Sequence, residues 1–477
     1  MQNRENHHEH PNHDFIENRT FDEIAVGDSA HLVRTLRPED IHLFAVMSGD
    51  VNPTHVDPEF ARSSQFREVV GHSMWGSVII SSILGTEFPG PGTVYVGQTL
   101  KFWRPITIGD TLTVTITCTH RFEHNHHLLL DCQCVNQDGL KVIDGTAEVM
   151  APTEKIKRPR VALPEITISD RQQRYLHALE LTKGLAPIPI AVAHPCDTES
   201  LRGPLQARDA GLVIPVLVGP EAKIREVAER EHLDLNGVRI VNVPHSHASA
   251  ETAVRLARTG EVEALMKGSL HTDELMSEVV AKETGLRTSR RISHVFMADV
   301  PTYPHPLLIT DAAINIEPSL EDKVHIIQNA IELAIMMGVP EPKVAILSAV
   351  ETVNVKIRST LDAAALCKMA DRGQIKGGLL DGPLAFDNAV SLIAAKTKGI
   401  RSAVAGQADI LVVPDLESGN MVAKQLEYLA DALMAGVVLG ARVPIVLTSR
   451  ADTAETRTAS CAIAQLMAHK RREGMRK

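Results

Sequence analysis

The stretch from Phe44 to Ala61 reads FAVMSGDVNPTHVDPEFA and carries Asp50 and His55 five positions apart. Residues that favour turns stand before and between these two: Gly49, Asn52 and Pro53. They are expected to end the preceding helix and to hold both side chains on one loop. A carboxylate and an imidazole on a rigid turn can share one water molecule, which one group polarises while the other moves a proton. An N-cap beside a surface histidine would explain the same spacing.

The residues around this stretch, from Phe21 to Pro152, have an α+β pattern. Helical spacing predicts helices over Arg37–Ser48 and Pro58–Phe66, and the nearly apolar run Met74–Phe88 suits a helix buried on most sides. Four strands separated by turn signals are expected after it: Thr93–Trp103, Thr111–Arg121, His127–Asn136 and Lys141–Met150. This order predicts a sheet wrapped around one central helix.

The whole string resembles the MaoC-like (R)-specific enoyl-CoA hydratases, whose motif is Ser-Gly-Asp-x-Asn-Pro-x-His-x-Asp. The matching positions are Ser48, Gly49, Asp50, Asn52, Pro53, His55 and Asp57. The later string GTEFPGPGTVYVGQTLKFWRPITIGDTL is also similar to this family. The resemblance implies a hot-dog fold, Asp50 and His55 as the catalytic pair, and hydration of short-chain 2-enoyl-CoA.

Such a hydration also needs hydrogen-bond donors at the thioester oxygen, where negative charge develops. Backbone N–H groups at the start of the apolar helix are candidates. The family has His-Gly-Met there, whereas this chain has His72-Ser73-Met74, so Ser73 supplies the N–H and adds a Cβ. The resemblance also places Ser73, Asn52 and Ser81 in the substrate-binding set, although Ser81 suits a small packing residue equally well.

Domain boundaries follow from composition. Residues 1–18 are polar and are expected to form a disordered tail, in which His7, His8, His10 and His13 are solvated. The hot-dog domain is expected over residues 19–152, a Pro-rich and cationic linker over residues 153–167, and a second domain over residues 168–477.

The second domain alternates short apolar runs with helical stretches, which predicts doubly wound, mostly parallel sheets. The expected buried strands include Pro187–Val192, Leu212–Val218, Val238–Val243, Val262–Met266, Val344–Leu347, Ile410–Val413 and Val443–Leu447. The expected helices include Ala222–Glu231, Ala250–Arg258, Leu320–Met337, Met421–Ala435 and Ala454–His469. Its length favours two lobes with a cleft, lobe I over about residues 168–303 plus 441–477 and lobe II over about residues 304–440. Polar loops follow several expected strands: Lys267-Gly268-Ser269, Asp381-Gly382-Pro383, Phe386-Asp387-Asn388, Ser418-Gly419-Asn420 and Ser449-Arg450-Ala451-Asp452-Thr453. Open α/β sheets build their sites from such loops.

Strings in this domain resemble the phosphate acetyl/butyryltransferases from about Pro195 to the end. They are PCDTESLRG, EALMKGSLHTDELM, KVAILSAVETVN, LDGPLAFDNAV, VAGQADILVVPDLESGN and PIVLTSRAD. The resemblance implies a phosphotransacylase fold and reversible acyl transfer between CoA and phosphate. It makes Ser449 and Arg450 the groups that bind and polarise the acyl phosphate, with Asp387 and Asn420 in the substrate-binding set. Asp452 is the expected base and Glu455 the reserve, while Asp452 as a helix cap stays an open alternative.

Composition limits the partners. A net charge of −10 and 3% aromatic residues argue against nucleic acid, and no apolar run reaches the roughly 20 residues of a membrane span. The six cysteines are scattered without zinc spacing, and Cys132 and Cys134, two apart in a strand-like run, are expected to be buried thiols on one face. The N-terminus MQNRENHHEHPNH has no apolar secretory core, so a cytoplasmic protein is expected. We expect no bound cofactor and no metal, with CoA thioesters and phosphate as substrates. Both resemblances imply a homo-oligomer.

Three functions compete on the sequence alone. The first is a bifunctional enzyme, and the second is an acyltransferase whose hot-dog domain only binds acyl-CoA or mediates dimerisation. The third is a metal-dependent decarboxylating dehydrogenase, which would need Asp381, Asp387 and Asp415 to converge on one ion.

Overall fold

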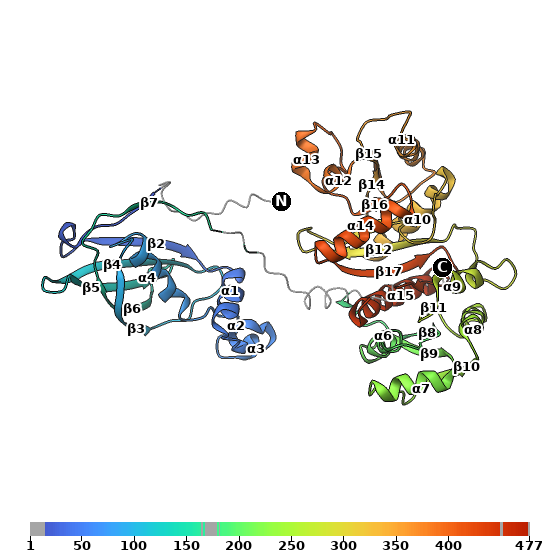
Figure 1. The fold of residues 1–477 in the computed structure, drawn as a ribbon, viewed down its shortest axis with the longest axis horizontal. Coiled ribbons are helices and arrows are strands. Elements are labelled where there is room, and N and C mark those ends of the chain that lie inside the picture. Colours follow the sequence, from blue (N-terminus) through green and yellow to red (C-terminus); the bar gives the residue numbers. More distant parts are fainter. Residues whose placement is uncertain (1–14, 164–165, 167–178, 181, 449–451, 476–477) are drawn as a thin grey trace. The chain divides into compact units, whose positions relative to one another are not determined.

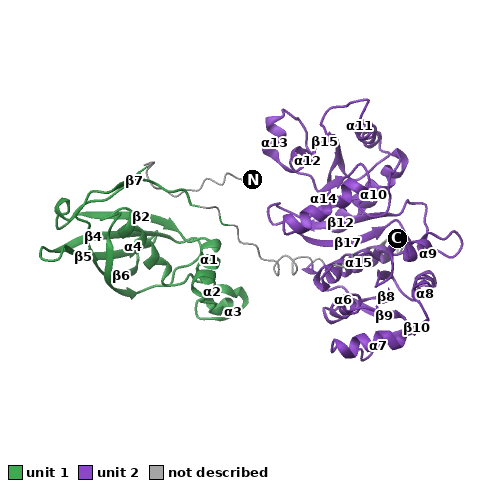
Figure 2. Ribbon diagram, viewed as in Figure 1, with its two compact units in different colours: residues 1–168 green, residues 169–477 purple. Residues whose placement is uncertain are grey.

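The computed structural model describes residues 15–163, 166, 179–180, 182–448 and 452–475 (Figure 1). The chain divides into two compact units, residues 1–168 and 169–477 (Figure 2). The four histidines of the expected solvated tail are among residues 1–14, which lie outside the described residues. Within the described ranges, no helix is long and apolar enough to cross a bilayer.

The first unit contains the expected sheet around a helix. Its 5-stranded antiparallel sheet has the order β2-β4-β5-β6-β3. The strands are β2 (Ser29–Thr35), β3 (Val94–Phe102), β4 (Thr111–Phe122), β5 (His127–Val135) and β6 (Lys141–Met150). The helices are η1 (Phe21–Glu23), α1 (Pro38–Ser48), α2 (Pro53–Val56), α3 (Pro58–Ser63) and α4 (Trp75–Thr86). Strand β2 and helix α2 were not predicted.

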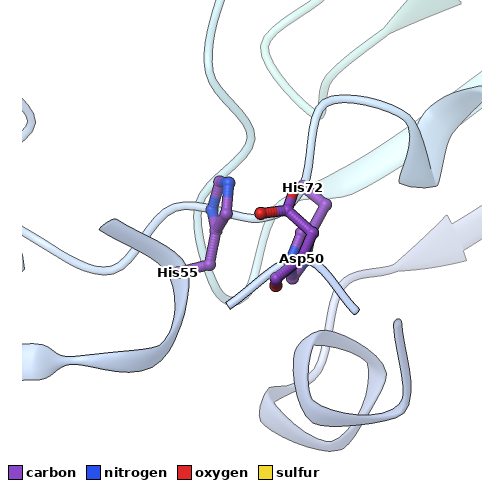
Figure 3. Close-up of side chains that lie close together, drawn as sticks. All are labelled: Asp50, His55 and His72. Atoms are coloured by element: carbon purple, nitrogen blue, oxygen red, sulfur yellow. The ribbon is translucent and has the colours of Figure 1, made fainter. Parts of the chain in front are cut away.

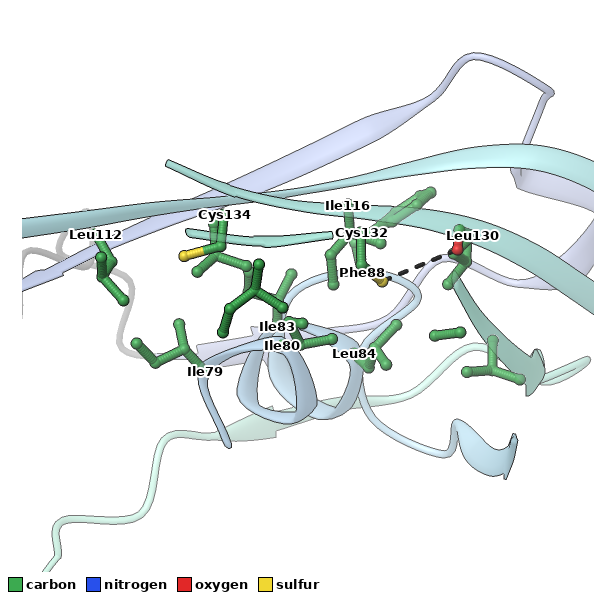
Figure 4. Close-up of a cluster of buried hydrophobic side chains, with 14 of the residues drawn as sticks. Ile79, Ile80, Ile83, Leu84, Phe88, Leu112, Ile116, Leu130, Cys132 and Cys134 are labelled. Atoms are coloured by element: carbon green, nitrogen blue, oxygen red, sulfur yellow. Dashed lines mark hydrogen bonds between the residues drawn. The ribbon is translucent and has the colours of Figure 1, made fainter. Parts of the chain in front are cut away.

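Helix α4 packs its apolar face against β4 and β5 (Figure 4). Ile80 and Ile83 have no exposed surface, and the alternating inward residues of β4 and β5 are buried with them. Cys132 and Cys134 are both fully buried on the same face of β5, which confirms the predicted buried thiols. The opposite face of α4 is open in the single chain, because Met74 and Val78 are 52% and 48% exposed. Helix α4 is thus buried on most sides, as expected, and exposes one face in the single chain.

Two predicted boundaries are wrong. The strand β1 (Phe15–Glu17) lies in the expected disordered tail, and it pairs in antiparallel fashion with β7 (Lys157–Pro159) in the expected linker. Lys155 contacts both Glu17 and Glu23, at 3.5 and 2.8 Å. Of the cations that suggested a solvated linker, Lys155 and Lys157 pair with acidic residues of the N-terminal segment and Arg160 pairs with Glu87, so the first part of the linker packs on the hot-dog unit.

The second unit is built on one 11-stranded sheet of order β10-β9-β8-β11-β18-β17-β12-β13-β16-β14-β15. Its strands are β8 (Ile188–Ala193), β9 (Val213–Gly219), β10 (Arg239–Asn242), β11 (Ala264–Lys267), β12 (Ser293–Asp299), β13 (Leu307–Thr310), β14 (Lys343–Leu347), β15 (Leu379–Leu384), β16 (Ile410–Val412), β17 (Leu433–Leu439) and β18 (Ile445–Val446). The two predicted parallel groups are present, and antiparallel β12 and β17 join them into one continuous sheet.

Helices lie on both faces of this sheet, as expected for a doubly wound fold (Figure 1). They are α6 (Thr198–Asp209), α7 (Glu221–Arg230), α8 (Ser246–Arg258), α9 (Thr272–Val280), α10 (Leu320–Met336), α11 (Arg358–Asp371), α12 (Phe386–Val390), α13 (Leu392–Thr397), α14 (Leu416–Leu429) and α15 (Ala454–Met475). One helix prediction is wrong at its end: α14 stops at Leu429, and the residues up to Ala435, expected to be helical, enter β17. A continuous apolar run does not separate a buried strand from a buried helix.

Candidate active sites

The Asp50 loop is shaped by the turn residues that predicted it. Gly49 closes α1 with φ 75°, a left-handed conformation that glycine adopts without a Cβ clash. Asn52 begins α2, where its Oδ1 accepts hydrogen bonds from the N–H and hydroxyl of Thr54 at 3.1 and 3.0 Å. Asp50 Oδ1 accepts a hydrogen bond from the Asn52 N–H at 3.2 Å. The Asn52 side-chain oxygen thus caps the start of α2. The Asp50 side chain remains exposed.

His55 on α2 is fixed by one strong contact. Its Nδ1 lies 2.7 Å from the main-chain oxygen of Val70. Because a carbonyl can only accept, Nδ1 carries the proton, and in the neutral ring Nε2 therefore carries the lone pair. A nitrogen or oxygen of each of Asp50, His55 and His72 lies within 4.8 Å of the others (Figure 3). The structure brings the predicted pair together, and its catalytic role stays a prediction.

The predicted thioester contacts lie on or beside α4. Ser73 is exposed in the turn before α4, where the Trp75 N–H donates to the main-chain oxygen of His72 at 2.9 Å. Ser81 is also exposed, on the face of α4 that the single chain leaves open. Ser81 is therefore not a packing residue within this unit. A role for either serine in substrate binding stays a prediction.

Two polar loops of the second unit meet at the carboxyl ends of the neighbouring parallel strands β13 and β16. Asp311 follows β13, and its carboxylate accepts hydrogen bonds from the N–H groups of three following residues, Ala313, Ile314 and Asn315. Asp415 follows β16 and caps α14 through the Ser418 N–H at 2.8 Å. Asn420 Nδ2 on α14 donates to the main-chain oxygen of Ala312 at 3.4 Å. The predicted Asn420 therefore joins the two loops.

Asp387 lies in a separate polar cluster after β15. Its carboxylate is 3.1 Å from Lys398 Nζ, and this hydrogen-bonded cation lowers the pKa of Asp387. Lys398 also reaches Glu351 at 3.4 Å. The neighbouring Asn388 has no exposed surface, and its Nδ2 donates to Glu351 at 3.5 Å. The predicted Asp387 is thus paired with a lysine.

The aspartates required by the dehydrogenase hypothesis do not converge. Asp415 caps a helix, Asp387 binds Lys398, and Asp381 accepts a hydrogen bond from the next N–H in the chain. Among the described residues, the side chains that lie close enough together to share a metal ion are Asp50, His55 and His72.

Ser449 and Arg450 lie outside the described residues, but the residues on either side are held by a buried arginine. Arg457 on α15 is 2% exposed. Its Nη1 donates to Thr448 Oγ1 at 2.7 Å and its Nε to the main-chain oxygen of Asp452 at 3.3 Å. The predicted base Asp452 is 9% exposed, whereas the reserve Glu455 is exposed. The Thr456 N–H is capped by the Thr453 hydroxyl at 3.4 Å.

Sequence reasoning missed three residues near these sites: His72, His294 and Arg457. His294 on β12 has no exposed surface, and its ring has no well-aligned hydrogen bond among the described residues, although the Leu447 carbonyl lies near. Burial lowers the pKa of His294 to about 4, against the opposing charge of Asp311. His294 stands in an ordinary apolar strand, so the sequence gives no signal for it. His72 stood in a string considered only for its N–H groups.

Comparisons with known proteins agree with both resemblances. Residues 247–465 match the family described as phosphate acetyl/butaryl transferase, and residues 25–127 match the MaoC like domain. A phosphate acetyltransferase of Rhizobium meliloti is 62% identical over 299 residues, which cover 63% of this chain and 95% of the relative. A phosphate butyryltransferase of Clostridium acetobutylicum is 42% identical over 60% of this chain and 95% of its own length.

Among solved structures, a branched-chain phosphotransacylase from Enterococcus faecalis is similar to this chain with 30% identity and a TM-score of 0.52. The match covers 59% of this chain and 99% of that protein. The 62% identity over nearly the whole bacterial relative is sufficient for assignment. The chain therefore belongs to the phosphate acetyl/butyryltransferase family, and it carries a MaoC-like hot-dog domain ahead of its transferase domain.

Proposed function

We propose that the chain is a bifunctional enzyme of acyl-CoA metabolism. Its first unit hydrates short-chain 2-enoyl-CoA to 3-hydroxyacyl-CoA, and its second unit transfers an acyl group reversibly between CoA and phosphate. The observation that carries the first activity is the approach of the Asp50 carboxylate to a His55 ring whose Nε2 is free of the proton. The similarity to named phosphate acyltransferases over almost their full length supports the second.

In the hydration, Asp50 and His55 hold one water molecule between them. The water oxygen adds to the carbon β to the thioester while its proton passes to one of the two groups, and a proton is returned to the α carbon. Negative charge develops on the thioester oxygen, and in this proposal it is bound by backbone N–H groups at the start of α4, including that of Ser73.

In the acyl transfer, phosphate attacks the thioester carbonyl and CoA leaves as the thiolate, so no covalent acyl-enzyme is needed. Ser449 and Arg450 bind and polarise the acyl phosphate, because a guanidinium fork suits phosphate oxygens. Asp452 is the base in the reverse direction, where it takes the proton of the CoA thiol. No bound cofactor is part of this reaction.

A paired assay on the full chain tests both activities. Hydration of crotonyl-CoA is followed at its enoyl absorbance, and phosphate-dependent CoA release is followed from acetyl- and butyryl-CoA. We expect Asp50→Asn to abolish hydration alone and Arg450→Ala to abolish CoA release alone. The acetyl and butyryl rates also decide the chain-length preference, since relatives of both names match this chain. Loss of both activities in either variant contradicts two independent sites.

The second candidate function is acyl transfer alone, with the hot-dog unit as an acyl-CoA binding or dimerisation module. Ser73 in place of the family's glycine favours it, because the added Cβ crowds the thioester. Wild-type protein that releases CoA but does not hydrate crotonyl-CoA would establish this alternative. Restoration of hydration by Ser73→Gly would then assign the loss to the Ser73 side chain.

A homo-oligomer and a cytoplasmic location complete the proposal. Strand β3 ends the sheet and exposes apolar side chains, namely Val94, Tyr95, Val96 and Phe102. An exposed apolar edge strand is normally covered, and a second copy is the occupant that we infer. Light scattering after size exclusion measures the mass, and Val96→Lys is expected to lower it. Free cysteines and CoA substrates both suit a reducing compartment.

A further inference from the structure

A buried histidine outside the predicted pair contacts both members of that pair. His72 lies in the turn before α4 and is 2% exposed. Its Nε2 is 3.0 Å from the main-chain oxygen of Asp50. Its ring centroid is 4.1 Å from that of His55, and it also stacks on Phe44 with the ring centroids 4.7 Å apart. One ring therefore touches the Asp50 backbone and the His55 imidazole together.

The two histidines need opposite tautomers for these contacts. The bond to the Asp50 carbonyl requires the proton of His72 on Nε2, whereas the bond to the Val70 carbonyl requires the proton of His55 on Nδ1. His72 Nδ1 is buried and has no hydrogen-bond partner among the described residues. The contact made by His72 Nε2 therefore fixes the position of the Asp50 backbone, and the flat face of the ring limits the rotation of His55.

The segment that carries His72 is itself firmly held. The Gly71 N–H donates to the Ile106 oxygen at 2.7 Å, and Val70 forms an antiparallel bridge with Thr107. A Cβ at position 71 would lie 2.6 Å from a Leu36 methyl carbon, so the chain passes closely against its neighbour. Val70 also supplies the carbonyl that binds His55. Residues 70–72 thus form a fixed support for the loop of residues 50–55.

We propose that His72 is a positioning residue of the hydratase site, which holds the Asp50 carboxylate and the His55 Nε2 at the spacing that lets them share one water molecule. The inference rests on the proposed hydration. Its physical basis is that catalysis by two groups on one water depends steeply on their separation, so that a misplacement of about 1 Å costs roughly 100-fold in rate. The donor on Nε2 is the essential feature, and the stacked ring is secondary.

Two substitutions separate the donor from the ring. His72→Phe keeps a flat ring that can contact Phe44 and His55 but removes the donor to Asp50. His72→Gln removes the ring but retains an N–H near the position of Nε2. His42→Gln is the matched control, because His42 is exposed on α1 in the same unit. The phosphate-dependent CoA release of each preparation measures its concentration independently of the hydratase site.

The experiment measures kcat and KM for crotonyl-CoA with wild type, Asp50→Asn, His72→Phe, His72→Gln and His42→Gln, together with thermal unfolding of each full chain. We expect His72→Phe to lose about 10- to 100-fold in kcat with little change in KM. His72→Gln should recover most of that loss, and His42→Gln should match wild type.

Each outcome decides a different point. Wild-type kcat in a folded His72→Phe, or equal losses in the Phe and Gln variants, overturns the positioning role while leaving the hydratase function intact. A rise in KM with kcat unchanged also overturns it, because His72 would then act on binding. Absence of hydration in the wild type overturns the proposed function and the inference together. If His72→Phe does not fold, the kcat of His72→Gln decides, and a loss above about 10-fold counts against the donor.

Discussion

The two candidate sites are built in different ways. Asp50 and His55 come from one short loop, and each is oriented by contacts with the segment of residues 70–72. In the second unit, Asp311, Asp387 and Asp452 follow three different strands, and each is held by its own local bonds. The first arrangement depends on turn geometry, whereas the second depends on the register of a large sheet.

This difference predicts how each site responds to damage. A loop site with few supports should lose activity through a change in any one of them while the unit stays folded. A site assembled from strand ends should be more tolerant of changes in a single loop, except where one buried group holds a loop in place. The two units also have separate hydrophobic clusters, so damage to one should not reach the other.

The largest effect is expected from Arg457. Replacement of this buried guanidinium by alanine removes its bonds to Thr448 and to the Asp452 backbone and leaves an unfilled space against Gly203. Arg457 also interacts electrostatically with the Asp452 carboxylate, and removing one partner of a buried charged pair costs about 3–5 kcal/mol. We expect Arg457→Ala to lower the stability of the second unit by about 4 kcal/mol and to abolish CoA release, measured by denaturant unfolding and by the transferase assay.

Arg457→Lys keeps the charge but not the two-nitrogen fork, so it separates the charge from the geometry. It should retain stability better than alanine while transferase activity stays low. Crotonyl-CoA hydration is the internal control and should be unchanged in both variants. A fully active Arg457→Lys would mean that the charge alone is needed around Asp452.

The second effect concerns the core of the first unit. Ile83 on α4 has no exposed surface and packs against the buried faces of β4 and β5. Removing a buried isoleucine side chain to alanine costs about 2–5 kcal/mol. Ile83→Ala should lower the stability of the hot-dog unit by about 3 kcal/mol and leave CoA release per folded molecule unchanged, as followed by calorimetry and enzyme assay.

The exposed face of the same helix provides the comparison. Val78 is 48% exposed in the single chain, so Val78→Ala should cost far less than Ile83→Ala if the chain is a monomer. A cost for Val78→Ala that approaches that of Ile83→Ala would instead indicate that a second copy covers this face. A fall of transferase activity in Ile83→Ala would contradict the independence of the two units.

The sequence predicted the fold well where period and turn residues agree. Helices α1 and α4 and strands β4 to β6 lie within about two residues of their expected bounds, which is the ordinary uncertainty at element ends. Strands β12, β13, β15 and β17 were missed, and the start of β17 was assigned to the expected helix Met421–Ala435 because a continuous apolar run does not separate a buried strand from a buried helix. The joining of both lobes into one sheet depends on β12 and β17, so it was missed as well.

The sites divide in the same way. Asp50 and His55 could be predicted because Gly49 and Asn52 hold them locally. His72 and Arg457 could not, because each acts through contacts between positions far apart in the chain or through a buried charge that no local pattern marks. His294 is the clearest case: its environment arises from β12, β17 and the end of β18 together.

The smallest effect is expected from His294 and appears as a pH dependence. Burial lowers the pKa of His294 to about 4 in the folded protein, below the ordinary value of 6.5. His294 therefore binds a proton more readily in the unfolded chain than in the folded one. As the pH falls from about 6.5 toward 4, this difference in proton binding lowers the free energy of unfolding. For a pKa shift of this size, the free energy of unfolding falls by about 2 kcal/mol between pH 7 and pH 5.

His294→Leu has a similar volume and no proton to bind, so it should flatten the stability of the second unit between pH 7 and pH 5. Leu429→Ala is the control, because Leu429 is 85% exposed and the change removes no titratable group. Denaturant unfolding at a series of pH values measures the slope. An unchanged slope in His294→Leu would mean that the buried imidazole finds a partner in the native protein, most simply the nearby Leu447 carbonyl. The folded protein would then accommodate the charged imidazole of His294 as well as the neutral one.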